Sequence, residues 1–341
     1  MKTAILYFAK TLGLFGLASW CTRYKIRILG YHGVWFSDNN FGNHLYIDPD
    51  KFHSRMKWLK QSKYSVISLS NAISDLQKKK VKPYTAVITI DDGWYGTYKY
   101  MLPVLEEESL PATLYVYTEA VESQKQLFHI LIPALIRLSR KSTLKLSGIE
   151  TEHTFNLNIN SSQEKDYASS YIIGLLNQLE EQKKEMFCHH IVTALGFDFE
   201  KICKSRQFSF ITFDELCNAN KRGLDIQLHT HTHNVDINHP EKIVEEIQIN
   251  REKLMPYVTS ELEHFCYPSG VHNDAMYHYL KQNKVISATV TDTGFVTTES
   301  NLLALKRILD GQQISQIEFE GEMSGFVELI RETKRNLRRL F

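Results

Sequence analysis

The sequence lacks several features that mark well-defined classes of protein. Its five cysteines are odd in number and form no C-x-x-C pair, which argues against a structural zinc site or a disulfide framework and favours a reducing compartment. Only 16 of the 341 residues are Gly and 8 are Pro, so a collagen-like or linker-like chain is excluded. The 40 Lys+Arg nearly balance the 39 Asp+Glu, and no basic stripe is present that would attract nucleic acid. Because 43% of the residues are hydrophobic, we expect a globular fold.

The N-terminal segment, residues 1–27, begins with an apolar run that is too short to cross a membrane. Lys10 interrupts the run, and the uninterrupted part, residues 11–21, has about half of the roughly 20 residues that a spanning helix needs. No small-x-small cleavage site of a signal peptide follows it. The run is followed by a basic flank of Arg23, Lys25 and Arg27. Two interpretations stay open: a helix in a membrane interface, and a helix packed on the domain.

Eight short β-rich runs, most of them followed by helical patterns, predict an α/β fold with parallel strands. At about 150 residues per domain the length suggests two domains, whereas a single α/β barrel of about 250 residues would leave roughly 90 to explain. We predict such a barrel over residues 28–341. The expected strands are 28–31, 65–69, 86–90, 112–117, 224–228, 263–267, 285–290 and 304–308.

One connection is much longer than the others. More than a hundred residues separate Tyr117 from Leu224, and they contain helical patterns at 127–140 and 172–179 around a polar stretch, 142–162, that suggests a loop or a small hairpin. We interpret residues 121–207 as a helical insertion in the barrel. Since it leaves from the C-terminal end of a strand, we expect it to begin on the catalytic face, where it could select the substrate.

Ionisable side chains follow most of the expected strands, at the barrel face where reactive groups gather. They are His32 after the first strand, Asp91 and Asp92 after the third, His229, His231 and His233 after the fifth, Asp292 after the seventh and Asp310 after the eighth.

Two of these groups have the residue types of a metal-dependent hydrolase. In Asp91-Asp92-Gly93, one carboxylate could hold a metal while the other acts as a base, although the same letters also form common turns. In the second group, His229 and His233 would share a face on a helical turn, whereas an extended segment would add His231. Two imidazoles and one carboxylate make an open three-ligand site.

These motifs and several others resemble those of the polysaccharide deacetylase family, also called the NodB homology domain or carbohydrate esterase family 4. Its motif T-F-D-D-G is similar to residues 89–93, and H-[ST]-x-[ST]-H is similar to residues 229–233. Weaker likenesses are Tyr31-His32-Gly33-Val34 to Y-H-x-V, Pro111-Ala112-Thr113 to P-A-T-F-F, Phe265–Gly270 to F-x-Y-P-x-G and Leu305–Ile308 to L-P-R-I. The resemblance implies a distorted (β/α) barrel of seven or eight strands.

The resemblance also implies a role for each matching residue. Asp91 would be the general base that takes a proton from the attacking water, and a divalent ion, zinc first among the candidates, would be held by Asp92, His229 and His233. The backbone N–H of Tyr267 would help to stabilise the oxyanion.

The sequence departs from the family pattern in two places. Cys266 stands where many members have an Arg that pairs with the catalytic Asp, and Arg307 could supply that charge instead. The late L-x-x-x-x-H motif, which provides the general acid, has no clear counterpart after residue 290. His32 is the preferred substitute, with His272 as the second choice.

The leading hypothesis is a metal-dependent deacetylase that hydrolyses the N-acetyl group of an aminosugar in a polysaccharide or its lipid-linked precursor. An O-acetyl or N-formyl hydrolase and a glycan-binding pseudoenzyme remain alternatives, although a binding module would have no need of the base Asp91. Without a convincing signal peptide, we expect a cytoplasmic location, with attachment to the inner face of the membrane left open, and a role in surface-polysaccharide biosynthesis.

Overall fold

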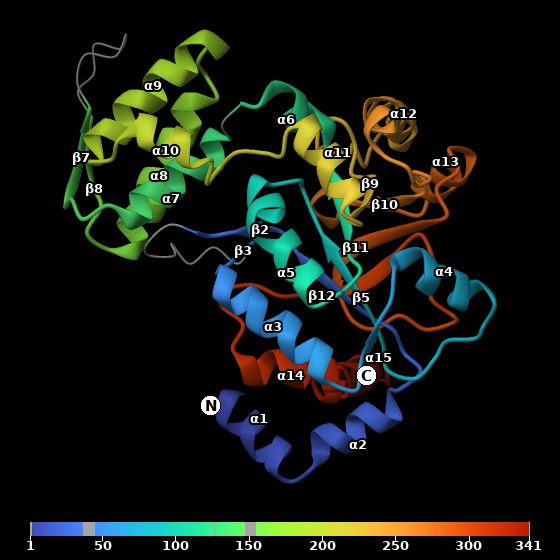
Figure 1. Cartoon of the computed structure of the whole chain (residues 1–341). Helices are drawn as coiled ribbons and strands as arrows, with labels where there is room; N and C mark the ends of the chain where they lie inside the picture. Colours follow the sequence, from blue (N-terminus) through green and yellow to red (C-terminus); the bar gives the residue numbers. More distant parts are fainter. Residues whose placement is uncertain (1, 37–44, 126, 147–154, 341) are drawn as a thin grey trace. The chain divides into compact units, whose positions relative to one another are not determined.

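Seven parallel strands close into a barrel in the computed structural model, which describes residues 2–36, 45–125, 127–146 and 155–340 (Figure 1). The strand order is β1-β12-β11-β10-β9-β6-β5, and pairing of β1 with β5 closes the ring. The expected barrel is therefore confirmed, with seven strands in the ring. They are β1 (Arg27–Tyr31), β5 (Thr85–Ile90), β6 (Thr113–Val116), β9 (Asp225–Leu228), β10 (His264–Cys266), β11 (Ser287–Thr293) and β12 (Leu305–Leu309).

The eighth expected strand lies outside the ring and is shorter than predicted. Strand β4 (Ser65–Val66) pairs only with β5. The prediction of a strand as far as residue 69 is wrong, because the Ser68 side chain accepts a hydrogen bond from the Asn71 N–H and begins helix α4 (Leu69–Gln77). The sequence patterns also missed a small parallel pair formed by β2 (Gly33–Val34) and β3 (Tyr46–Ile47).

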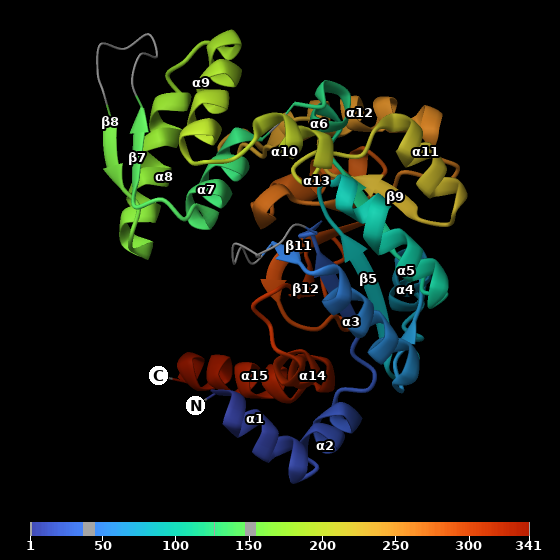
Figure 2. The ribbon, with the colours of Figure 1, turned by 60° about the vertical axis from the view of Figure 1, so that its left-hand side comes forward.

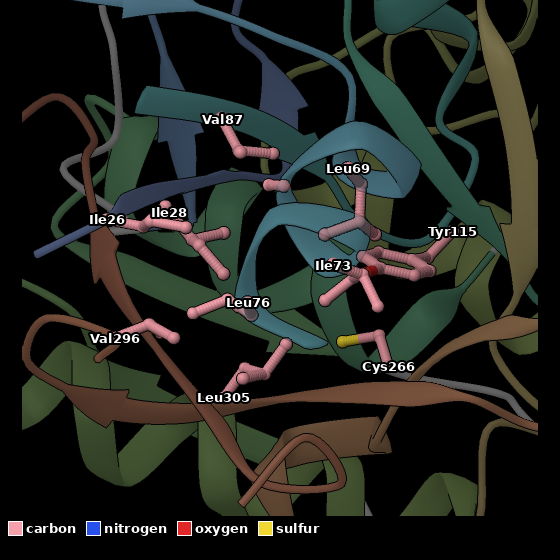
Figure 3. Close-up of a cluster of buried hydrophobic side chains, with 11 residues drawn as sticks. Ile26, Ile28, Leu69, Ile73, Leu76, Val87, Tyr115, Cys266, Val296 and Leu305 are labelled. Carbon is pink, nitrogen blue, oxygen red and sulfur yellow. The ribbon is translucent and has the colours of Figure 1, made fainter. Parts of the chain in front are cut away.

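Helix α4 covers the N-terminal end of the barrel with apolar side chains. Leu76 points from α4 towards Ile28 of β1 and Leu305 of β12, whereas Leu69 and Ile73 lie beside Tyr115 (Figure 3). The cluster is fully buried and extends to Tyr115 and Cys266 farther along the barrel interior. We call this group the apolar plug. The sequences of the strands are nearly continuous apolar runs, because one face of each strand lies in the barrel interior and the other is covered by helices.

Further helices follow the strands and surround the ring. Helix α3 is capped by Asp48, which accepts the N–H of Asp50, and the Thr212–Glu215 capping box begins α11. The helices of this layer are α3 (Pro49–Gln61), α5 (Leu102–Glu107), α6 (Thr118–Ser123), α11 (Phe213–Lys221), α12 (Ile243–Leu254) and α13 (Met276–Gln282).

The two ends of the chain form four neighbouring helices, α1 (Lys2–Thr11), α2 (Leu14–Cys21), α14 (Gln316–Ser324) and α15 (Phe326–Leu340). Leu6, Ala9 and Phe15 are buried against Ile317 of α14, so one face of the N-terminal segment is packed on the domain. Among the described residues no single helix is long and apolar enough to cross a membrane. The bent pair 3–11 and 14–21, with an angle of 83° at the break, satisfies that test of length and composition only as a pair.

The chain divides into two compact units. The barrel unit comprises residues 1–34, 44–123 and 211–341, and the insertion unit comprises residues 35–43 and 124–210. The insertion unit contains α7 (Phe128–Leu138), β7 (Thr143–Leu146), β8 (Phe155–Asn158), α8 (Ser162–Leu176), α9 (Glu181–Ala194) and α10 (Phe199–Ser205). Strands β7 and β8 form an antiparallel hairpin beside these helices, within the polar stretch that suggested a loop or a hairpin (Figure 2).

Candidate active site

Two adjacent aspartates follow β5 at the C-terminal end of the barrel. Every residue of β5 is buried, and Asp91 and Asp92 remain buried just beyond it. The backbone of Asp92 adopts φ +77° and that of Gly93 φ +85°. A left-handed conformation is costly for Asp and free for Gly. The sharp turn aims the two carboxylates in different directions, as the D-D-G motif predicted.

The histidine-rich loop after β9 is neither a helical turn nor an extended segment. Thr230 and His233 have φ of +65° and +58°, which folds the loop so that the rings of His229 and His233 lie 4.9 Å apart. His231 instead faces Thr118, with 2.9 Å between its Nδ1 and the hydroxyl oxygen. Both backbone alternatives considered from the sequence are therefore wrong, and His231 lies outside the cluster.

Asp92, His229 and His233 form a group that fits a metal ion. One ligand atom from each lies within 4.8 Å of the others. Asp92 Oδ1 is 3.2 Å from His229 Nε2 and 3.4 Å from His233 Nε2. These distances match the edge, about 3.3 Å, of a tetrahedron whose ligands lie about 2.0–2.1 Å from a central ion. The side chain of His233 is one-third exposed, so the group is open to a substrate on that side.

Neighbouring groups hold two of the three ligands, His229 and Asp92, in place. His229 Nδ1 lies 2.7 Å from the carbonyl oxygen of Cys266. Because a carbonyl oxygen only accepts, Nδ1 must carry the hydrogen, which leaves Nε2 free as the ligand atom. The His229 backbone N–H donates to Asn250 Oδ1, and Trp94 Nε1 donates to Asp92 Oδ2 at 2.9 Å. Burial alone would raise the pKa of Asp92, but without an ion the protonated forms of His229 and His233 donate hydrogen bonds that hold it well below its ordinary value.

Asp91 lies outside the ligand group, between Arg307 and His32. The Arg307 guanidinium donates to both carboxylate oxygens at 2.7 Å, and His32 Nε2 is 3.3 Å from Oδ2. Burial alone would raise the pKa of Asp91, but Arg307 and then His32 hold it below the ordinary value. Burial also lowers the pKa of His32, although Asp91 opposes this effect. Asp91 is therefore ionised and His32 neutral near neutral pH.

Arg307 occupies space that small neighbours leave. Its guanidinium also donates to Thr89 Oγ1 and lies 3.3 Å from Cys266 Sγ. A Cβ added at Gly30 would meet Arg307 Nη1 at 3.4 Å and the Leu309 side chain at 2.6 Å. Arg307 thus supplies the positive charge that pairs with Asp91, which Cys266 cannot supply.

The expected role of Tyr267 is wrong. Its backbone N–H donates to the Thr289 carbonyl within the sheet, and its hydroxyl donates to the Leu303 carbonyl, so neither is directed at a substrate. Pro268 has no N–H, and the N–H groups of Gly270 and Val271 bond within the turn. Within 267–271, all described residues, Ser269 alone keeps a backbone N–H without a bonded acceptor. The one signal for Ser269 in the sequence is its position directly after Pro268, which makes its N–H the first one beyond the proline.

Three other candidates from the sequence lie apart from the reactive groups. His272 Nδ1 is 2.9 Å from the Gly270 carbonyl oxygen, and its ring lies 5.1 Å from that of Tyr267. Asp310 accepts hydrogen bonds from Arg55 and from the Tyr31 hydroxyl, so it ties α3 to β12. Asp292 lies exposed within β11 and does not pair with Arg307.

Sequence comparison agrees with this geometry. The family model described as polysaccharide deacetylase matches residues 78–166 and 199–286, which make up just over half of the chain. The chain belongs to the polysaccharide deacetylase family. Membership places it among hydrolases of the polysaccharide deacetylase class. The Bacillus subtilis (strain 168) protein YxkH, named as a polysaccharide deacetylase, is 31% identical over 98 residues, which cover 28% of this chain and 33% of that protein.

Solved structures of deacetylases have a similar fold. The Streptococcus pyogenes deacetylase PplD, in complex with acetate, matches with a TM-score of 0.58 at 17% identity, covering 89% of this chain and 99% of that one. IcaB from Ammonifex degensii matches with a TM-score of 0.56 at 14% identity, covering 88% of this chain and 97% of that one. At such identities the likeness establishes the fold alone.

Proposed function

We propose that the chain is a metal-dependent deacetylase that hydrolyses the N-acetyl group of an aminosugar in a polysaccharide or its lipid-linked precursor. One observation carries the proposal. A buried, ionised carboxylate, Asp91, adjoins a ligand group of two histidines and one aspartate at the C-terminal end of the barrel. Family membership supports the same reaction class.

A divalent ion bound by Asp92, His229 and His233, zinc in our proposal, would act as a Lewis acid on the acetyl carbonyl and lower the pKa of a water molecule. Asp91 accepts the proton of the attacking water. Arg307 keeps Asp91 ionised and fixes its orientation through two hydrogen bonds, so the base needs no rearrangement before it acts.

The proton must then reach the leaving nitrogen, so that acetate and a free amine are released. His32 is the group for this transfer, since its Nε2 lies 3.3 Å from Asp91 Oδ2 and its side chain is partly open to solvent. We assign the Ser269 N–H, in place of that of Tyr267, to the oxyanion that forms on the acetyl group.

Acetate release from a panel of N-acetylated and O-acetylated glycans, together with formate release from N-formylated ones, tests this function. We expect acetate from N-acetylated glycans alone, its loss with a chelator and its return with zinc. Release confined to O-acetylated or N-formylated glycans would instead identify the other hydrolase. Glycan binding without any release would identify a pseudoenzyme. The cytoplasmic location, the role in surface-polysaccharide biosynthesis and substrate selection by the insertion unit stay predictions.

A further inference from the structure

Exposed apolar side chains gather at one place in the described part of the chain. Thirteen large apolar side chains are exposed in the described residues. Seven of them lie in one stretch of the N-terminal segment, residues 5–24. Single exposed apolar residues are common, whereas a gathered group marks an interaction surface. The seven are Ile5, Tyr7, Phe8, Leu12, Leu17, Trp20 and Tyr24, which we call the docking face.

Six of the seven side chains of the docking face form two helical stripes. Ile5, Phe8 and Leu12 are three and four residues apart and lie on one side of α1 and the turn after it. Leu17, Trp20 and Tyr24 have the same spacing along α2 and the turn after it. The opposite sides of the two helices are packed on the domain, so each helix is apolar on both faces and only one face has a partner.

A groove between α2 and α15 extends the docking face. Leu17 and Cys21 line one wall, Leu329 and Ile330 line the other, and the groove has a volume of about 460 Å³. Ile330 is itself 40% exposed. In both ribbon views α1 and α2 form the outermost layer of this part of the barrel unit, beyond α14 and α15 (Figures 1 and 2).

The two ends of the chain carry an excess of positive charge although the whole chain has a net charge of only +1. Residues 1–27 contain five Lys+Arg and no Asp or Glu, and residues 316–341 contain five Lys+Arg and five Glu, so together they carry a net charge of +5. Some of these charges are paired or buried: Lys10 pairs with Glu320, Lys25 with Glu332, and Glu328 with Arg331 and Arg335, while Arg27 is buried in β1.

Aromatic and cationic groups adjoin each other on the docking face. The Arg23 guanidinium lies 4.3 Å from the Trp20 ring centre and 4.9 Å from that of Tyr24. Trp and Tyr are the residues that favour the boundary between lipid headgroups and hydrocarbon, and nearby Lys and Arg are attracted to anionic headgroups.

We propose that the docking face rests on an anionic lipid bilayer, with α1 and α2 lying in the interface. The bend of 83° at the break and the lengths of 10 and 8 residues suit two helices along a surface better than one helix through it. A second copy is a poorer partner, because two positively charged faces would oppose each other in a symmetric dimer. The proposal does not depend on the proposed deacetylase activity.

Co-sedimentation of the full chain with vesicles tests the proposal. We expect binding to vesicles of mixed phosphatidylcholine and phosphatidylglycerol, and binding at least about tenfold weaker to phosphatidylcholine alone or at high salt. Equal binding to both vesicles would overturn the anionic part of the proposal. No binding to either would overturn it altogether, as would a dimer in light scattering that the variant below disrupts.

A matched pair of double variants assigns the binding to the docking face. Phe8→Glu with Leu17→Glu changes two side chains that are 66% and 60% exposed, and we expect binding to mixed vesicles to fall at least about tenfold. Tyr167→Glu with Met255→Glu adds the same charge at side chains that are 64% and 62% exposed, and should bind as wild type does. Both variants should melt at the wild-type temperature, since all four side chains are exposed. Equal loss in the two double variants, or no loss in the first, would contradict the assignment.

Discussion

The two ends of the barrel interior are filled by different kinds of side chain: charged groups at the C-terminal end and apolar groups at the N-terminal end. At the C-terminal end, buried charges satisfy one another: Arg307 holds Asp91, and the histidines hold Asp92. At the N-terminal end, the apolar plug of α4 excludes polar groups almost completely. Cys266 lies at the boundary, within the plug and 3.3 Å from the Arg307 guanidinium. Stability and reactivity therefore depend on separate ends of one fold.

Removing a ligand should have the largest effect, and it should be confined to the C-terminal end. We expect His229→Ala to lose its bound ion and about 10³-fold or more of its acetate release, because the ion supplies several kcal/mol of transition-state stabilisation. Metal analysis after gel filtration and acetate assays would measure both. His231→Ala is the control, since that ring faces Thr118, and it should keep the ion. Loss of the ion in both variants would contradict the geometry of the cluster.

Breaking the buried ion pair between Arg307 and Asp91 should lower the stability of the protein, although the pair lies at the C-terminal end of the barrel. Arg307→Leu leaves Asp91 buried without its partner, and we expect the free energy of unfolding to fall by about 3–5 kcal/mol in chemical denaturation. Adding Asp91→Asn should recover much of that stability, because the uncompensated charge is gone. If the double variant is no more stable than Arg307→Leu, the loss comes from packing rather than charge.

A cavity in the apolar plug should lower the stability of the protein and leave its acetate release nearly unchanged. Ile73 is 1% exposed, and Ile73→Ala should lower the free energy of unfolding by about 2–5 kcal/mol. The rate constant for acetate release should stay within a few-fold of wild type in the fraction that is folded. A fall in that rate as large as the one in His229→Ala would show that the two ends are not independent.

His264, which contacts α4 at the N-terminal end of the barrel, should make the stability of the protein decrease in acid. It joins Ser70 of α4 to Ser287 of β11, and burial lowers its pKa to about 4. Below pH 6.5 the unfolded chain binds a proton that folded His264 does not accept until about pH 4. The free energy of unfolding should therefore fall as the pH falls through this window, by up to about 3 kcal/mol. Denaturation curves of His264→Gln should lack this component, and an unchanged pH dependence would refute it.

Much of the fold could be predicted from the sequence because strongly apolar, β-rich runs read clearly. All eight expected strands exist, and the strand ends gather the aspartates and histidines as expected. The strand expected at 65–69 failed beyond residue 66, because one capping hydroxyl, that of Ser68, outweighs the apolar pattern around Ile67.

The candidate site was less predictable where backbone conformation decides it. The left-handed residues Thr230 and His233 separate His231 from its neighbours, and no spacing rule reveals them. The Tyr267 N–H is taken by Thr289, a contact between strands that only the register of the sheet fixes. Such long-range pairing lies beyond any local pattern.

Acetate release by Asp91→Asn protein loaded with its ion tests the central claim most directly. Our account predicts that this variant binds as much ion as wild type does, since Asp91 lies outside the ligand group, but releases acetate about 10²–10⁴-fold more slowly because the base is lost. A rate within a few-fold of wild type, with the ion in place, would contradict the assignment of Asp91 and with it the division of the two carboxylates into base and ligand.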